Sequence, residues 1–310
     1  MPTNPHHDVL YRELSIVQLK EFKPSPTAFL QEVVNFGTNA FVRCLSNAEG
    51  EENIHLAPFA LYRHILELTD GTEILVSNAS PNASIPLLRS SFEALLALEF
   101  ILEDNEHYEL RSLSWLAGYV RRTIQIYSSL LPQTIEGEKF LRAIEEDKDV
   151  RTFPLPPEDE VSKAIQNLNH LLSREQFRAI VSEYDLQKRK RPKQEPHWYS
   201  LFGGPKTLYE LADHLQRPAQ YDGLYRQWSM STHANDFRPF IANAKSGQRA
   251  IRGLRDLVGT YQVTTFAVTF IIEATRLLIN KFHPGETWGN WYSREVRDAY
   301  LQSARAFDHR

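Results

Sequence analysis

The stretch SNASPNASIPLLRSSFEALLALEFILED, residues 77–104, places a compact breaker directly before a long apolar helical pattern. Its first eight residues are Ser, Asn, Pro and Ala, a mixture that favours turns. Ser84 and Pro86 suit the start of a helix, because serine caps a helix and proline fits its first turn. Apolar residues then recur at helical spacing. The stretch predicts the second arm of a helical hairpin whose first arm ends near Asn78.

The same helical periodicity recurs along most of the chain, while the alternation typical of strands is scarce. We expect further helices from Pro26 through Leu45 and over about 58–78, 106–131, 205–217, 221–236, 248–282 and 293–307. The sequence contains no repeat of fixed period. These patterns predict an all-α fold, an array of long antiparallel helices with a less regular middle.

The middle of the chain differs in composition from the rest. FPLPPEDEV (153–161) and QKRKRPKQEP (187–196) are rich in proline and charge, and the helical patterns between them are short. We therefore expect four parts, which are an N-terminal arm (1–25), a first helical core segment (26–132), a peripheral insertion (133–204) and a second helical core segment (205–310).

Charge and cysteine content exclude several classes of protein. The 310 residues include 35 Lys and Arg against 39 Asp and Glu, which gives a formal net charge of -4. That balance argues against a dedicated, sequence-independent DNA binder. Cys44 is the single cysteine, so an internal disulfide is excluded and a thiolate zinc site is not expected. A lone cysteine suits a reducing compartment.

The sequence does not predict a membrane protein. The opening MPTNPHHDVLYRE lacks the basic start and apolar run of a secretory signal. The most apolar stretch, 263–279, contains Glu273 and Arg276. Each would cost ~3 kcal/mol at the centre of a bilayer. We expect a buried core helix there and a cytoplasmic protein.

The densest polar and aromatic stretch is LYRQWSMSTHAND, residues 224–236. Arg226 and His233 are seven positions apart, which is about two helical turns, so they share a face with Ser229 between them. A guanidinium binds phosphate oxygens, and an imidazole exchanges a proton near neutral pH. The pattern predicts a set of groups that handles phosphodiesters. The alternative is a buried polar network that fixes how this helix packs.

RQWSMSTH resembles the arginine-to-histidine pattern of the HEPN superfamily, all-helical domains that are often metal-independent ribonucleases in toxin and phage-defence systems. The resemblance implies that Arg226 binds phosphate and the transition state and that His233 performs acid–base work. Gln227 follows the arginine, where the superfamily usually has Asn, Asp or His, and the six-residue gap is at the long end of its range. The resemblance also implies a homodimer, since such sites form at dimer interfaces.

A broader likeness covers about half of the chain. Residues 57–131 and 221–282 look like an uncharacterised family of bacterial helical proteins known only as a domain of unknown function. The likeness is carried by an Arg-Ser-x-x-Glu helix (RSSFE, 89–93) and a Tyr-Arg-x-x-Ser-x-x-x-His helix (225–233). It implies a fold more strongly than an activity.

Arg89 and Glu93 lie one turn apart on the helix that this likeness singles out. The surrounding Leu, Phe and Ala residues predict a largely buried helix, and a buried charge must be paired. Two interpretations follow. The residues form an ion pair within the helix, or they orient Arg226, Ser229 or His233 across a helix interface, with Glu93 holding one imidazole tautomer.

The most basic run ends in aromatic residues. It consists of Lys188, Arg189, Lys190, Arg191 and Lys193, and Trp198 and Tyr199 follow. Basic charge beside aromatic rings is typical of single-stranded nucleic-acid binding, here RNA. A solvated loop is the alternative.

Three functions from different classes remain open. The first is a metal-independent ribonuclease or toxin or phage-defence effector acting on RNA, with Tyr225, Gln227 and Ser229 supporting Arg226 and His233. The second is a non-catalytic helical module that binds nucleic acid or a protein, including one encoded nearby. The third is a small-ligand pocket lined by Tyr225, Trp228 and Arg89. We expect no metal or cofactor, because the sequence lacks a P-loop and a His-Glu-x-x-His motif.

Overall fold

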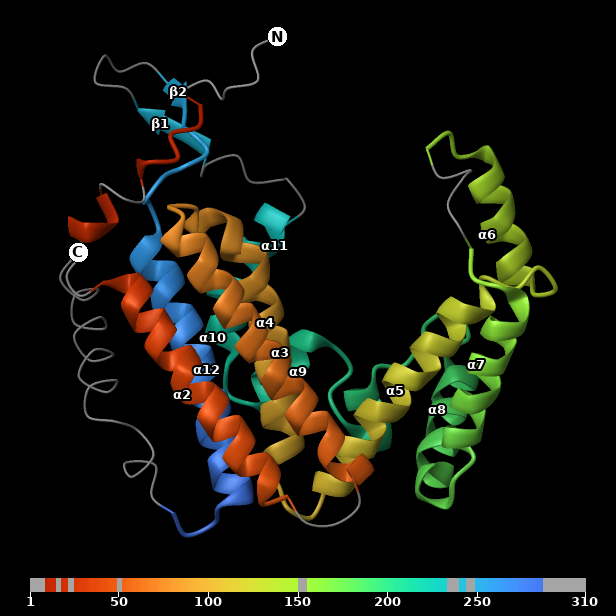
Figure 1. The fold of residues 1–310 in the computed structure, drawn as a ribbon. Helices are drawn as coiled ribbons and strands as arrows, with labels where there is room; N and C mark the ends of the chain where they lie inside the picture. The colour runs from red at the N-terminus through yellow and green to blue at the C-terminus, as the bar shows by residue number, and fades with distance from the viewer. Residues whose placement is uncertain are drawn as a thin grey trace. The chain divides into compact units, whose positions relative to one another are not determined.

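The computed structural model describes residues 9–14, 18–21, 25–48, 52–149, 155–232, 240–243 and 249–286. The chain forms two compact units (Figure 1). The first unit comprises residues 1–51, 58–104 and 208–310, and the second comprises residues 52–57 and 105–207. Helices dominate both, which confirms the all-α class.

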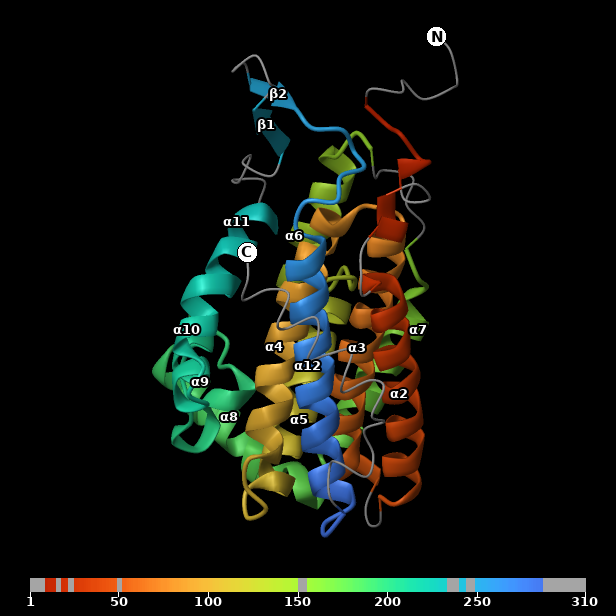
Figure 2. The same ribbon diagram turned by 90° about the vertical axis from the view of Figure 1, so that its left-hand side faces the viewer.

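The first unit is built on long helices that lie side by side (Figures 1 and 2). They are α2 (Pro26–Ser46), α3 (Glu52–Ser77), α4 (Ile85–Leu102) and α12 (Thr260–Phe282). Residues 52–57, at the start of α3, belong to the second unit. A short helix η1 (Leu19–Glu21) precedes them. The direction of α3 opposes that of α2, because Gln31 contacts Glu73 while Gly37 accepts a hydrogen bond from Tyr62. At Gly37 a Cβ atom would lie 2.9 Å from the Leu66 side chain, so glycine permits this approach.

The breaker before α4 forms the turn that its composition predicts. Ala79 adopts a left-handed backbone with φ 54°, and the 3₁₀ helix η2 (Pro81–Ser84) follows. Ser84 was expected to cap α4, but its hydroxyl donates to the Pro81 carbonyl oxygen at 2.6 Å. The cap is absent because Ser84 has φ -86° and ψ -6°, whereas a capping serine adopts an extended backbone.

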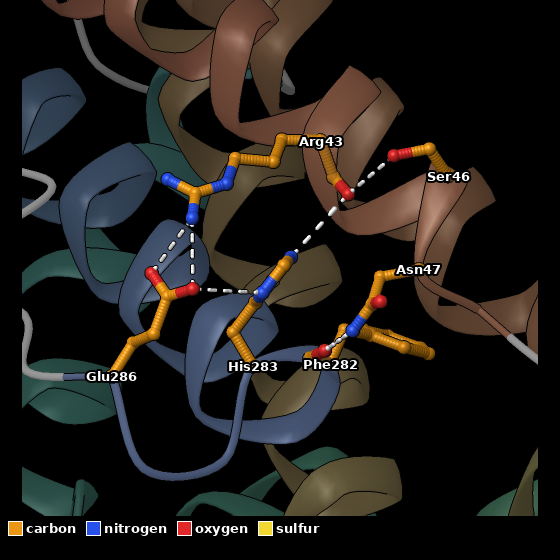
Figure 3. A network of polar contacts seen from close by, with 6 residues as sticks. All are labelled: Arg43, Ser46, Asn47, Phe282, His283 and Glu286. Carbon is orange, nitrogen blue, oxygen red and sulfur yellow. Dashed lines mark hydrogen bonds and ion pairs between the residues drawn. The ribbon is translucent and has the colours of Figure 1, made fainter.

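Helix α12 packs on α2 and α4. It runs parallel to α2, because Gly37 lies near Ile271 while Asn47 contacts Phe282. It also runs parallel to α4, because Phe270 contacts Phe92 while Gly259 lies near Asn82. This part of the fold differs from the antiparallel array that the sequence predicts. The end of α12 lies beside the end of α2, where Asn47 donates to the Phe282 carbonyl oxygen. Figure 3 shows this junction, in which Arg43 donates to both carboxylate oxygens of Glu286 at 2.8 and 3.0 Å. His283 lies between them, with Nδ1 3.3 Å from Glu286. No short turn joins α4 to α12, so the local sequence does not determine whether these two helices run parallel or antiparallel.

The helix predicted from residue 248 begins twelve residues later. Arg249–Ile251 instead forms strand β2, which pairs antiparallel with β1 (Ile241–Asn243). Arg252 then pairs with Asp256 at 2.7 Å, and the Asp256 carboxylate accepts from the Val258 N–H. These local bonds compete with helix formation. The helix predicted over 293–307 lies outside the described residues.

Among the described residues, α12 is long and apolar enough to cross a membrane by length and composition. More than half of its apolar window is buried in the unit. Glu273 and Arg276 form an ion pair on its surface. The helix is therefore a core element, as the sequence predicts.

The second unit has its own core. Its helices are α5 (Tyr108–Ser128), α6 (Ile135–Glu146), α7 (Glu158–Leu172), η3 (Glu175–Phe177), α8 (Arg178–Lys190) and η4 (Trp198–Gly203). The buried cluster consists of Leu113, Leu116, Ala117, Val120, Phe177, Ile180, Tyr184 and Leu201. The insertion expected over 133–204 lies in this unit, which starts earlier because α5 packs on α7, α8 and η4.

A segmented stretch completes the first unit and packs on α4 (Figure 2). It consists of α9 (Leu208–His214), α10 (Pro218–Gln220), the π-helical turn η5 (Tyr221–Tyr225) and α11 (Arg226–Thr232). Two helices were expected here. The π turn makes the second one irregular, and a π turn inside a helix often marks a functional position.

Candidate functional site at the α4–α11 interface

An acidic edge of α4 binds the α9–α11 segment. The Glu103 carboxylate lies 2.9 Å from Nε2 of His214. One turn earlier on α4, Glu99 accepts from Nε and Nη2 of Arg217 at 2.6 and 3.3 Å. Because later residues of the segment meet earlier residues of α4, the two elements run antiparallel. These ion pairs fix the segment along its length.

The third contact along this edge is a cluster of Tyr225, Arg89 and Glu93. The Tyr225 hydroxyl accepts from Nη2 of Arg89 at 2.7 Å and donates to Oε1 of Glu93 at 2.9 Å. Arg89 and Glu93 are themselves 3.4 Å apart, so the ion pair predicted within the helix is present. Among the described residues, Nε of Arg89 is buried and has no hydrogen-bond partner. The cluster therefore retains one unused donor.

Aromatic stacking sets the orientation of the Tyr225 ring. Its centroid lies 4.9 Å from that of Tyr221, which in turn meets Tyr209 edge-on at 5.4 Å. Cζ of Arg89 lies 4.8 Å from the Tyr225 centroid, close enough for a cation–π interaction. Tyr221 and Tyr225 stack because they occupy the two ends of the π turn.

Burial and the contacts within the cluster set the protonation states of Tyr225 and Arg89. Burial raises the pKa of Tyr225, and the hydrogen bond from Arg89 only partly opposes this. Burial alone would lower the pKa of Arg89, but the hydrogen bond to Tyr225 and the nearby negative charges outweigh it, so that pKa is raised. At neutral pH the phenol is neutral and donates to Glu93, while the guanidinium stays charged.

The predicted phosphate-binding residue projects elsewhere. The Arg226 side chain is 70% exposed, and its Nη1 lies 3.1 Å from Oδ1 of Asp222, four residues earlier. Gln227 is exposed as well, and Ser229 is partly buried. Within the described part of the segment, Tyr225 is the supporting residue that contacts Arg89 and Glu93. His233 lies outside the described residues.

Trp228 anchors the same helix to the core of the unit. It is buried, and its ring meets Phe266 and Phe270 edge-on at 5.4 and 6.2 Å. Tyr225 faces α4 while Trp228 faces α12. The contacts of these two aromatic residues therefore fix the helix that carries Arg226 on both sides.

The basic run lies at the end of α8 in the second unit. Lys188 is bound to Glu195 at 2.7 Å, and the other members, Arg189, Lys190, Arg191 and Lys193, are exposed. The two aromatic residues that follow are buried or partly buried. Tyr199 is buried and stacks on His197, and Trp198 packs partly buried against the core cluster.

The ion pair of Arg217 and Glu99, which joins the α9–α11 segment to α4, was not predicted from the sequence. Arg217 and Glu99 are 118 positions apart, so no helical spacing relates them. The ion pair of Asp222 with Arg226 could have been predicted, because Asp222 precedes Arg226 by four residues, the spacing of an ion pair on a helix.

A family model described as a family of unknown function, DUF5677, matches residues 55–248. The matched range includes α4 and the α9–α11 segment, so both sides of the site fall within it. No curated protein and no solved structure matches the chain.

Proposed function

We propose that this chain, which belongs to the DUF5677 family of unknown function, is a metal-independent ribonuclease of the HEPN type. The family description names no activity, so the proposal rests on this chain's own residues. The observation that carries it is the exposed Arg226 guanidinium, which stands on a helix held by Tyr225 on one side and Trp228 on the other.

Arg226 is suited to bind a phosphodiester. Its ion pair with Asp222 is solvent-exposed on both sides, and such pairs contribute only ~0–1 kcal/mol. A phosphate therefore displaces the carboxylate at little cost. The planar guanidinium then donates two parallel hydrogen bonds to the phosphate oxygens. A fixed donor of this kind stabilises charge that develops in a transition state.

His233 supplies the proton transfer. As base it takes the proton from a ribose 2′-hydroxyl, and the resulting oxygen attacks the adjacent phosphorus. The bond from phosphorus to the 5′-oxygen breaks, and that oxygen takes a proton from solvent. The products are a 2′,3′-cyclic phosphate and a 5′-hydroxyl. Arg226 stabilises the charge on the crowded phosphorus, so the reaction needs no metal ion.

Tyr225, Arg89 and Glu93 are positioning residues in this proposal. They fix α11 to α4 and thereby fix the place of Arg226. Gln227 and Ser229 lie on the same helix and complete the surface that faces RNA. A homodimer, as the HEPN resemblance implies, would bring two such helices together.

The test is incubation of the purified chain with mixed RNA in the presence of EDTA. We expect cleavage to 2′,3′-cyclic phosphate ends. Arg226→Ala and His233→Ala each lose about a hundredfold or more in rate, the scale on which one transition-state donor or acid–base group acts. Arg63→Ala is the matched control, because Arg63 is an equally exposed arginine paired with a carboxylate four residues away, and it keeps full activity.

Three outcomes contradict the proposal. Cleavage that persists in His233→Ala, or that requires a divalent cation, excludes this mechanism. RNA binding without any cleavage supports the second class of function, a non-catalytic module. Toxicity on expression that Arg226→Ala relieves and Arg63→Ala does not is a further sign of a toxin or defence effector.

A further inference from the structure

The second unit contains a cavity of about 270 Å³ between the end of α8 and the loop that follows η4. Its lining includes Gln187, Lys190, Arg191, His197, Ser200 and Lys206. The volume is just below the ~300–1,000 Å³ found for small-molecule sites. A cavity of this size takes a single small ligand rather than a chain.

The charge of the cavity is positive. Lys190 and Arg191 line the cavity and have no ion pair or side-chain hydrogen bond within the part of the chain that the structure describes. Two carboxylates also line it. Glu195 is neutralised by Lys188 at 2.7 Å and by Arg121, whose Nε lies 3.8 Å away.

The second carboxylate does not cancel this charge. Glu183 accepts a hydrogen bond from Gln187 at 2.8 Å, and it lines the cavity together with Lys190 and Arg191. The two cations Lys190 and Arg191 therefore outnumber Glu183, which has no ion pair among the described residues, and an anionic ligand is favoured.

The wall of the cavity is fixed by hydrogen bonds. Gln187 donates to the Ser200 carbonyl oxygen at 2.9 Å, and the Ser200 hydroxyl contacts Gln187 Oε1 and the His197 carbonyl oxygen at 3.2 and 2.7 Å. At Gly204 a Cβ atom would lie 2.1 Å from the Tyr199 carbonyl oxygen, so the loop closes tightly there. The adjacent Phe202 adopts a left-handed backbone with φ 54°. Such strain is held in place by its surroundings and gathers at ligand sites.

An aromatic platform completes the cavity. His197 is exposed and stacks on buried Tyr199, with centroids 4.9 Å apart and planes within 6°. One face of the imidazole is therefore backed by a second ring. Nucleobases stack on such faces without regard to sequence.

We propose that this cavity binds one nucleoside monophosphate, either free or as the 5′-terminal nucleotide of an RNA. Lys190 and Arg191 hold the phosphate, and the base stacks on His197. The amides and hydroxyl of Gln187 and Ser200 face the ribose. The inference does not depend on the proposed ribonuclease activity, because it concerns other residues in the other unit.

The experiment is calorimetric titration of the full chain with AMP, adenosine and inorganic phosphate. We expect AMP to bind and to lose at least about tenfold in affinity in the double variant Lys190→Gln/Arg191→Gln. His197→Ala weakens AMP binding but not phosphate binding. Arg189→Gln is the matched control, since it removes a neighbouring charge on α8 outside the lining, and it leaves affinity unchanged. Circular dichroism checks that each variant is folded.

A trinucleotide with a 5′-phosphate, compared with AMP, separates the two sources of ligand. Tighter binding of the trinucleotide assigns the site to RNA ends, and tighter binding of AMP assigns it to free nucleotides. The inference is overturned if AMP does not bind at millimolar concentration, if phosphate binds as tightly as AMP, or if Arg189→Gln weakens binding as much as the double variant. His233→Ala keeps AMP binding, so failure of the ribonuclease and failure of this site are distinguishable.

Discussion

At the residue scale, Tyr225 shows how one hydroxyl satisfies two charges. Arg89 and Glu93 on a helix could pair with each other alone, yet at 3.4 Å their contact is longer than either contact to the phenol. The hydroxyl accepts from the cation and donates to the anion, so each ion keeps a hydrogen bond in a half-buried position. This contact explains why polar residues cluster on a helix that otherwise packs through apolar rings.

Tyr225→Phe tests this role directly. The change removes both hydrogen bonds but keeps the ring and its stacking on Tyr221. We expect the free energy of unfolding to fall by about 1–2 kcal/mol, since bonds to charged groups are lost at a partly exposed site. Tyr209→Phe is the control, because it makes the same chemical change on the ring at the other end of the stack.

Urea unfolding followed by circular dichroism measures both variants. An unchanged stability of Tyr225→Phe would mean that water replaces the phenol without loss. An equal effect of Tyr209→Phe would assign the change to the aromatic stack rather than to Arg89 and Glu93.

At the element scale, two ion pairs join the α9–α11 segment to α4, and the pair of Arg217 and Glu99 is the stronger of them. Their side chains are 13% and 22% exposed, whereas those of His214 and Glu103 are 42% and 36% exposed. Screening by water weakens an exposed pair far more than a buried one. The inner pair therefore holds the segment, and the outer pair adds little.

A double-mutant cycle with Arg217→Met and Glu99→Gln measures that difference. We expect a coupling energy of about 1–3 kcal/mol between these two sites, the range for contacting residues in one network. The same cycle on His214→Gln and Glu103→Gln is the control and gives less than about 1 kcal/mol. Denaturant unfolding of the single and double variants supplies the values. Equal couplings for the two pairs would contradict the ranking by burial.

The long helices could be predicted because their signals are local. Pro26 begins α2, with Ser25 accepting from the Ala28 N–H as its cap. The breaker before α4 likewise ends one helix and starts the next. The prediction that α12 starts at residue 248 was wrong. The pairing of β2 with β1 and the Arg252–Asp256 contact override an apolar pattern that fits a helix.

The candidate site was predictable only in part. The four-residue spacing of Arg89 and Glu93 predicts their ion pair, because both residues lie on one helix. The contact of Tyr225 with Arg89 and Glu93 could not be predicted from spacing in the same way. A π turn shifts the helical register, so Tyr225 rather than a residue of the Arg226 stripe faces α4. The assignment of Arg226 and His233 to catalysis stays a prediction.

At the scale of the whole molecule, both units bury groups that would ionise at high pH. Burial raises the pKa of the Cys44 thiol to about 12 in the first unit. Burial also raises the pKa of the Tyr62 phenol in the first unit and of the Tyr108 and Tyr184 phenols in the second. Each group is neutral when folded and must stay neutral for its unit to remain packed.

Alkaline pH should therefore destabilise the protein through both units. Each pKa is higher in the folded state than the ordinary 9.0 of a thiol or 10.0 of a phenol. Below those ordinary values both states are protonated and stability is intact. Above them the unfolded chain loses protons that the folded chain keeps, so the free energy of unfolding falls as pH rises.

Tyr184→Phe separates one contribution from the rest. The Tyr184 hydroxyl is buried and has no hydrogen-bond partner among the residues that the structure describes, so its removal leaves stability near neutral pH unchanged or slightly higher. It also removes one group that ionises only on unfolding. We expect the variant to lose less stability than the parent chain between about pH 8 and about pH 10.5, as measured by urea unfolding at each pH. If the two chains lose stability equally, the Tyr184 phenol is not among the groups whose pKa is raised by folding, and the alkaline loss comes from the other buried groups.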